Sequence, residues 1–327
     1  MKYLILKLTN NCNLRCKYCY ANLSSDLDGD ISNRNMDFET AKKAIDYLLS
    51  IDNNLKIQFT GGEPLLNFEL LKKIVEYCNN LNLQIKNENK RENKRENKIN
   101  KINKLNKLNN KKYNIKFAIQ TNGTIINSEI IEFIKKFKIG LGISLDDLNN
   151  EFRVYANEKP CKIDVLKNMT LLKQNGVHFG ITSVITSKNM CETILEELII
   201  YLLSLEVHSI SFDFLKLKNK DEFDNNGIFE PEYEDFIKLI NKLGAKKYPI
   251  SIKNLNRKNN NGNSNKYCYL NSGDLLYVNE VGNIYACPTL EGIDNMYFGT
   301  VNDLNNNFKL PKFNSKGCFA RYYLKNI

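Results

Sequence analysis

The chain has 327 residues, of which 42% are hydrophobic and 26% charged, with nine cysteines, two histidines and a formal net charge of +10. This length can bury the cores of one large domain and one small domain. No apolar run reaches the roughly 18 residues of a membrane helix. We also expect no secretory signal at the N-terminus, because a predicted strand begins by Tyr3. We therefore expect no membrane partner. The grouping of the cysteines favours a reducing, cytoplasmic location over a disulfide-rich secreted protein.

Most of the positive charge lies in one low-complexity segment, residues 86–112. It contains eleven Lys or Arg and three Glu, a net charge of +8 that leaves about +2 for the rest of the chain. A basic run can bind nucleic acid, but this one has no aromatic residue to stack on bases. We predict a disordered, solvated insertion between the second helix and the third strand, and no nucleic-acid partner.

Strand and helix patterns alternate along most of the chain, which predicts an α/β fold with a parallel sheet. The predicted strands are residues 3–7, 55–60, 115–120, 139–144, 178–186 and 209–215. The predicted helices are residues 37–52, 67–80, 128–137, 162–175, 191–205 and 231–243. Ligands of parallel sheets bind at the carboxyl ends of the strands, so we expect the functional site at that edge.

Three cysteines form the motif C-x3-C-x2-C on the loop that leaves the first predicted strand. They are Cys12, Cys16 and Cys19, and Tyr18 precedes the last of them. Thiolates, usually four of them, hold four-iron clusters, so three close together can hold three irons and leave the fourth open to another ligand. A zinc site is the alternative. Structural zinc normally takes four ligands, however, and no fourth Cys or His lies nearby in the sequence.

A second motif, Gly61-Gly62-Glu63-Pro64, ends the second predicted strand. Two glycines let the backbone approach a ligand closely, and a carboxylate can accept hydrogen bonds from an ammonium group. The same residues also suit an ordinary strand-to-helix turn, with the proline near the start of the helix. Their place, one βα unit after the cysteines, favours a ligand site.

Polar motifs also follow the third and fourth predicted strands, Q-T-N-G at 120–123 and S-L-D-D at 144–147. With the two earlier motifs, they make the chain resemble the radical S-adenosylmethionine (SAM) superfamily, in particular its peptide-modifying, sulfatase-maturase-like members with a SPASM or twitch domain. The resemblance implies a partial, TIM-like (β/α)6 barrel that binds a [4Fe–4S] cluster and SAM. It assigns the cluster to Cys12, Cys16 and Cys19, and SAM contacts to Tyr18, Gly61, Gly62, Glu63, Ser144 and Arg153.

Some of these residues keep an alternative interpretation. Arg153 matches only part of a family motif, because Asn150-Glu151 stands where His-Asp is common; it is a partner for the SAM carboxylate or a solvated surface arginine. Asp213, inside the sixth predicted strand, is a candidate acid or base, since a charge in a strand needs a partner; a backbone group or a lysine is the plainer partner. Cys78 matches no motif and is expected to be buried.

The C-terminal part contains C-x13-G-x4-C, from Cys268 to Cys287, with a predicted hairpin turn at 279–283 and Cys318 further on. It resembles the auxiliary-cluster domain (SPASM, or the shorter twitch) of the same family. Ser315 and Leu324 stand where that family has further cysteines, which excludes two complete auxiliary clusters. One auxiliary cluster on the three remaining cysteines, a fold that has lost its metal, and a truncated gene all stay open.

We therefore expect a radical SAM core at residues 1–225, a helix and Asn-rich linker at 226–265, and a truncated SPASM/twitch-like domain at 266–327. The resemblance implies reductive cleavage of SAM to a 5′-deoxyadenosyl radical, with the electron supplied by a donor such as flavodoxin or ferredoxin. The radical would abstract hydrogen from a ribosomally made peptide or a protein and give a thioether, a carbon–carbon link or an oxidised residue. The alternatives are a sulfatase or cofactor maturase, and a non-catalytic iron–sulfur or peptide-binding partner.

Overall fold

The computed structural model describes residues 1–21, 35–95, 112–149, 151–216, 227–253, 268–315 and 318–326. In these residues one ten-stranded sheet has the order β10-β9-β8-β1-β2-β3-β4-β5-β6-β7. The strands are β1 (Lys2–Lys7), β2 (Asn54–Thr60), β3 (Asn114–Thr121), β4 (Gly140–Ser144), β5 (Phe179–Ile185), β6 (Ser209–Phe214), β7 (Ser251–Ile252), β8 (Leu275–Val278), β9 (Asn283–Tyr285) and β10 (Tyr297–Thr300). The α-helices are α1 (Phe38–Ile51), α2 (Phe68–Arg95), α4 (Ser128–Phe137), α5 (Lys162–Gln174), α6 (Glu192–Ser204), α8 (Tyr233–Ala245), α9 (Tyr269–Ser272) and α10 (Phe319–Lys325).

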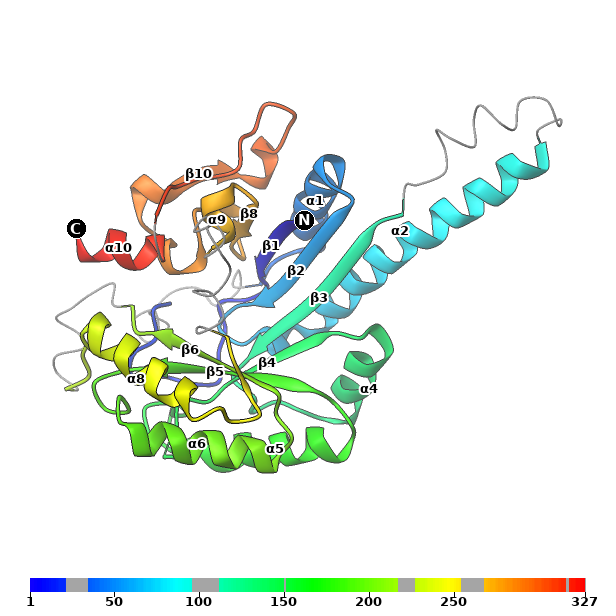
Figure 1. Ribbon diagram of the computed structural model, residues 1–327. Helices are drawn as coiled ribbons and strands as arrows, with labels where there is room; N and C mark the ends of the chain where they lie inside the picture. The colour runs from blue at the N-terminus through cyan, green and yellow to red at the C-terminus, as the bar shows by residue number, and fades with distance from the viewer. Residues whose placement is uncertain are drawn as a thin grey trace.

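The predicted α/β fold with six parallel strands is confirmed. Strands β1 to β6 pair in parallel in chain order and overlap all six predicted strands. In β2 every second residue, Leu55, Ile57 and Phe59, is fully buried and belongs to the main hydrophobic core. This core fills the space between the sheet and the outer helices, among them α2, α4, α5 and α6 (Figure 1). The residues between, such as Gln58, point to the opposite side, here called the inner face.

Helix α2 is longer than predicted, because it continues through Arg95 into the low-complexity segment. Lys, Arg and Glu are good helix formers, and each of Glu88 and Glu92 has an arginine three residues later, a spacing that supports a helix. Figure 1 shows α2 projecting well past the sheet. The predicted disorder is therefore wrong for residues 86–95, and the part of that prediction on residues 96–111 lies outside the described residues.

Two hydrogen bonds join the chain on either side of this segment. The Asn82 side chain donates through Nδ2 to Tyr113 O and accepts through Oδ1 from Tyr113 N, both at 3.0 Å. Helix α2 and the start of β3 are thus already in contact at residues 82 and 113. The core of the sheet does not need residues 86–112 to bring these elements together.

The C-terminal part extends the same sheet. Strand β8 pairs in parallel with β1, from Tyr3 opposite Leu275 to Leu6 opposite Val278. The predicted hairpin at 279–283 is confirmed, because β8 and β9 are antiparallel and the turn places Gly282 at a φ of +86°, a backbone conformation that favours glycine. The C-terminal strands therefore lie beside the strand from which the cysteines follow.

The last helix reaches back to the other side of the barrel. The guanidinium of Arg321 on α10 lies 4.0 Å from the ring centre of Phe214 and 4.2 Å from that of Tyr233. Its Nε also donates to Glu230 at 2.8 Å. Residues 268–315 and 318–326 thus contact both β1 and the end of β6, and they cover the open side of the partial barrel (Figure 1).

Two smaller expectations concern the body of the protein. Cys78 on α2 is 1% exposed and lies in the main core, as predicted. Among the described residues, every helix is too short or too polar to cross a bilayer.

Candidate active site

The three N-terminal cysteines lie on the cysteine loop, defined as residues 9–20, at the carboxyl edge of the sheet. The loop is fixed on two sides by its backbone. Gly62 N donates to Thr9 O at 2.8 Å, and Arg15 N donates to Val154 O at 2.6 Å. The loop is therefore held between the glycine turn after β2 and the segment that precedes α5.

Gly61 and Gly62 are required by this close approach. A Cβ atom on Gly61 would lie 2.6 Å from Thr9 O, and one on Gly62 would lie 2.9 Å from Cys12 Cβ. Any side chain at these positions would push the cysteine loop away from β2. The motif that sequence analysis assigned to SAM thus also seats the cysteine loop.

Glu63 supports the site from beneath. It is fully buried, and its carboxylate accepts hydrogen bonds from Leu65 N at 3.1 Å, Thr121 Oγ1 at 2.8 Å and Asn122 N at 2.7 Å. Burial raises the pKa of this carboxyl, although the three donors act in the opposite direction. The carboxylate joins the turn after β2 to the turn after β3. Among the described residues, Gly61 and Gly62 line the neighbouring cavity and Glu63 does not.

Tyr18, Asp146 and Arg153 form a buried network behind the cysteine loop. The Tyr18 hydroxyl donates to Asp146 Oδ2, and Arg153 Nη1 donates to the Tyr18 oxygen at 3.1 Å. Arg153 is only 7% exposed, so the interpretation as a solvated surface arginine is wrong. Its Nε is buried without a partner among the described residues. Burial raises the pKa of Asp146, and the neighbouring guanidinium opposes that effect.

Two residues of Q-T-N-G contribute side chains that sequence analysis did not assign. Asn122 Nδ2 donates to Asn13 Oδ1 at 2.9 Å and lies 3.9 Å from Cys12 Sγ. Gln120 Nε2 donates to Ser144 Oγ at 3.0 Å, which fixes the hydroxyl expected to contact SAM. Their position at the carboxyl end of β3, beside the cysteine loop, was the available signal.

Two thiols of the loop, Cys12 and Cys16, are protonated at neutral pH when no metal is bound. Burial raises the pKa of Cys12 to about 11 and that of Cys16 to about 12. Metal ligation by cysteine requires the thiolate, so binding must release these protons.

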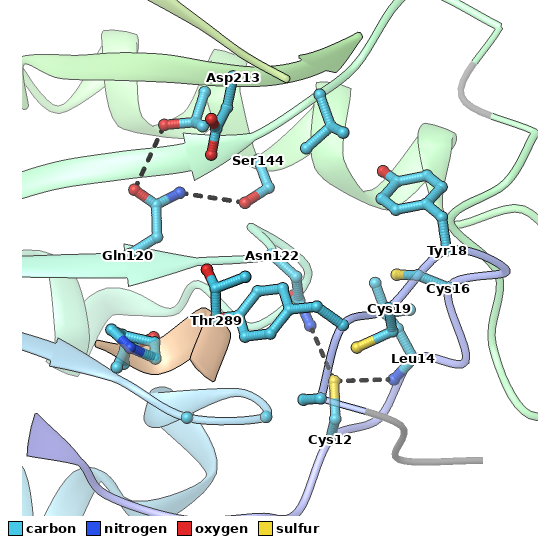
Figure 2. Close-up of a pocket in the computed structure, with 18 of the residues that line it drawn as sticks. Cys12, Leu14, Cys16, Tyr18, Cys19, Gln120, Asn122, Ser144, Asp213 and Thr289 are labelled. Carbon is cyan, nitrogen blue, oxygen red and sulfur yellow. Dashed lines mark hydrogen bonds between the residues drawn. The ribbon is translucent and has the colours of Figure 1, made fainter. Parts of the chain in front are cut away.

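These elements surround one cavity of about 550 Å³ (Figure 2), within the range of small-molecule sites. Figure 2 shows the three cysteines on one side and Gln120 and Ser144 on another. The lining includes Tyr3, Cys12, Cys16, Tyr18, Cys19, Gln58, Gly61, Gly62, Gln120, Asn122, Ser144, Arg153, Thr182, Asp213, Lys216, Pro288 and Thr289. Asp213 accepts from Lys216 Nζ at 2.7 and 2.8 Å and from Phe214 N at 2.9 Å, so its partners are a lysine and a backbone group, the plainer of the two expectations.

The residues at this cavity fit an iron–sulfur cluster. The three loop cysteines are partly exposed and line the cavity, and the unpartnered Nε of Arg153 lies in the same wall. Among the described residues, no group of three or more His, Cys, Asp or Glu side chains could hold a metal ion. A four-iron cluster instead spreads its thiolates over separate irons.

The three C-terminal cysteines gather in a second hydrophobic cluster. Burial is the main cause that raises the pKa of Cys287 to about 12, and the neighbouring Cys318 and Cys268 contribute to this rise. Ser315 Oγ donates at 3.1 Å to an asparagine of α9, and Leu324 is buried in the cluster. The two positions that lack the expected cysteines thus have packing roles of their own.

Sequence comparison identifies relatives of the chain. A family model, the Radical SAM superfamily, matches residues 6–199. An uncharacterized protein of Methanocaldococcus jannaschii is 49% identical over 99% of this chain and 96% of its own length. The radical SAM cyclopropyl synthase TigE of Paramaledivibacter caminithermalis is 26% identical over 93% of this chain and 60% of its own length. A cysteine-type anaerobic sulfatase-maturating enzyme of Clostridium novyi is 26% identical over 57% of this chain and 44% of its own length. The chain thus spans about half the length of these two enzymes.

Solved structures share the fold. Native anSMEcpe with bound AdoMet has a TM-score of 0.64 at 19% identity, over 92% of this chain and 78% of that chain. Streptococcus suis SuiB bound to S-adenosylmethionine has a TM-score of 0.62 at 15% identity, over 92% of this chain and 63% of that chain. Because the family match covers more than half of the sequence, the protein belongs to the radical SAM superfamily and is an enzyme related to peptide and protein maturases.

Proposed function

We propose that this enzyme binds SAM in the cavity and modifies a peptide or protein substrate there. The observation that carries the proposal is the composition of the cavity wall, which joins the cysteine loop and strand ends to Pro288 and Thr289 of the C-terminal part. The family implies a [4Fe–4S] cluster, for which Cys12, Cys16 and Cys19 are the proposed ligands. When bound and reduced by a donor such as a flavodoxin or ferredoxin, the cluster supplies the electron that cleaves SAM into methionine and a 5′-deoxyadenosyl radical.

The protein's own part is to orient SAM. The backbone of Gly61 and Gly62 is free of side chains at the cavity wall, and the proposed role of this turn is to bind the methionine amino group. Ser144 Oγ, fixed by Gln120 at 3.0 Å, is proposed to contact the ribose. The buried Nε of Arg153, which has no partner among the described residues, suits the SAM carboxylate, because guanidinium and carboxylate form strong charge-assisted hydrogen bonds. Such fixed groups position a reactant before the chemical step.

The C-terminal part is proposed to exclude water and to contact the substrate. It joins β1 through β8 and the end of β6 through Arg321, so it covers the open side of the cavity. A closed site protects a reactive radical from side reactions. Cys268, Cys287 and Cys318 are proposed to hold one auxiliary cluster at this wall.

A peptide or protein substrate is supported by the relatives. One is the subtilosin biosynthesis protein AlbA of Bacillus subtilis, 28% identical over 57% of this chain and 34% of its own length. The solved structures include native anSMEcpe with AdoMet and the Kp18Cys peptide, with a TM-score of 0.67 at 20% identity, over 92% of this chain and 78% of that chain. The sulfatase-maturating relatives favour a second candidate function, the maturation of a sulfatase.

The first experiment tests SAM cleavage. Protein reconstituted with iron and sulfide under anaerobic conditions is incubated with SAM and dithionite, and 5′-deoxyadenosine is measured by liquid chromatography. We expect product from the wild type and none from Cys16→Ala. The matched control is Cys191→Ala, at an exposed cysteine outside the cavity, which should match the wild type. Undiminished product from Cys16→Ala would contradict the ligand assignment.

The second experiment tests the substrate class. Cys-containing peptides and a sulfatase-derived peptide are added separately, and each is analysed by mass spectrometry. A thioether or a carbon–carbon link removes two hydrogens from the peptide, with deoxyadenosine formed above the peptide-free level. Modification of the sulfatase peptide alone would favour the second candidate function. Unchanged peptides and unchanged deoxyadenosine across the set would count against a peptide substrate.

A further inference from the structure

Three lysines approach one another on the inner face, near the amino ends of the strands. Lys56 on β2 and Lys116 on β3 are cross-strand partners. Both lie on the inner face, because each is four residues before a cavity-lining strand end, Thr60 and Gln120. Lys253, just after β7, comes from the opposite side of the barrel. Three separate strands thus bring amines into one region.

The opposite wall is built from small residues, which leaves room for these amines. Gly180 on β5 has no side chain, and a Cβ atom there would lie 2.8 Å from Ser209 Oγ and 3.8 Å from Lys253 Nζ. Gly140 and Gly142 occupy the same face of β4. The Lys253 amine therefore lies beside Gly180 on the inner face of β5, and the lysine as a whole is exposed.

The cavity approaches this region, although none of the three lysines lines it. Tyr3 and Gln58 line it on the side of β1 and β2, and the Tyr3 hydroxyl donates to Gln58 Oε1. The Lys56 amine lies 4.9 Å from the centre of the Tyr3 ring. Lys56 thus contacts a residue that lines the cavity, at the end of the strand away from the cysteine loop.

The amines lack an opposite charge. No carboxylate of the described residues forms an ion pair with any of the three. Burial lowers the pKa of Lys56, and Lys253 and Lys116 lower it as well, so each of these two lysines is close enough to repel Lys56. A bound anion would relieve this repulsion and raise the pKa of Lys56. An unpaired cationic group beside a cavity is therefore suited to a negatively charged ligand.

We propose that Lys56, Lys116 and Lys253 form a subsite that binds a carboxylate of the peptide substrate. This inference rests on the proposed function and specifies its substrate class. Four strand residues separate Lys56 from Thr60, about 13 Å at 3.3 Å per residue. An extended peptide covers the same distance in about four residues. The substrate therefore has an acidic side chain or its terminal carboxylate about four residues from the modified position.

The test compares two peptides on the reconstituted, SAM-bound enzyme. Both have blocked termini and four alanines, and they end in glutamate or in glutamine. We expect calorimetry to show at least ten-fold tighter binding of the glutamate peptide to the wild type. The preference should fall to about one in Lys56→Met/Lys253→Met. It should persist in the matched control Lys135→Met/Lys238→Met, whose lysines lie exposed on α4 and α8.

A further variant guards against misfolding, because Lys56 is half-buried. Lys116 is exposed, so Lys116→Glu should fold normally and should bind the glutamate peptide more weakly than the glutamine peptide. Equal binding of the two peptides to the wild type, or no binding of either, would overturn the proposal. Inorganic phosphate that binds through the lysines while neither peptide does would equally overturn it, in favour of a small-anion site.

The same preparations separate this inference from the proposed function. Deoxyadenosine formation without peptide depends on the cysteine loop and should be unchanged in the lysine variants. Normal deoxyadenosine with no preference for glutamate would reject the subsite alone. A lysine-dependent preference in a wild type that forms no deoxyadenosine would reject SAM cleavage and keep the subsite.

Discussion

Glu63 offers a decisive test of how the G-G-E-P turn works. Its carboxylate is the acceptor for three buried donors, at 3.1, 2.8 and 2.7 Å. A buried donor left without a partner costs about 1–3 kcal/mol, and the Thr121 hydroxyl can rotate to another acceptor, so the two backbone N–H groups dominate. Glu63→Ala should therefore lower the free energy of unfolding by about 2–6 kcal/mol, a large fraction of the roughly 5–15 kcal/mol of a typical protein.

Glu63→Gln separates support from direct ligand contact. The amide keeps one acceptor oxygen and places its NH2 group against a backbone donor, so the expected loss is about 1–3 kcal/mol, measured by urea unfolding of the metal-free protein. The control is Glu69→Gln, whose side chain is 77% exposed and pairs with Lys72; an exposed pair contributes about 0–1 kcal/mol. An unfolding free energy of Glu63→Gln within about 0.5 kcal/mol of wild type, with SAM affinity reduced ten-fold or more, would refute the supporting role and indicate direct contact with SAM.

Three further predictions concern other parts of the molecule. Replacement of residues 86–112 by a short Gly-Ser loop should leave deoxyadenosine formation near wild type, since hydrogen bonds at residues 82 and 113 already join α2 to β3; a marked fall would show that the segment shapes the site. Arg321→Ala should lower the free energy of unfolding by about 1–3 kcal/mol through lost ring stacking and ion pairing, and an unchanged value would contradict this. With all loop cysteines replaced by alanine, the chain should retain about four irons that are lost on Cys287→Ser; iron near zero would indicate a C-terminal part without metal.

Local patterns carried most of the fold prediction. The six parallel strands were predictable because short apolar runs that alternate with helical patterns are typical of a parallel sheet. The pairing of β8 with β1 was not, because a four-residue apolar strand, Leu275–Val278, carries no information about its partner. The extension of α2 was missed for another reason. The repetitive composition of 86–95 was interpreted as disorder, although its residue types favour a helix.

The site was predictable as a set of motifs but not as a set of contacts. The sequence placed the cysteines and the glycine turn at one edge, and the structure brings them together around one cavity. It could not show that the carboxylate of Glu63 faces Thr121 and Asn122, since that contact joins two strand ends that are far apart in the chain. Arg153 was equally ambiguous, because only its burial beside Tyr18 distinguishes it from a surface residue.

Strand β1 connects the two halves of the cavity wall. Its last residue, Lys7, is 5% exposed and forms ion pairs with Glu280 at 3.0 Å and Glu291 at 2.9 Å, both from the C-terminal part. Tyr277 adds a hydrogen bond to Glu291 at 2.6 Å. Removing one partner from a buried ion pair costs about 3–5 kcal/mol, so Lys7 strongly favours the docked arrangement. Because the cysteine loop begins two residues after Lys7, these ion pairs tie the C-terminal part to the strand end from which the loop starts.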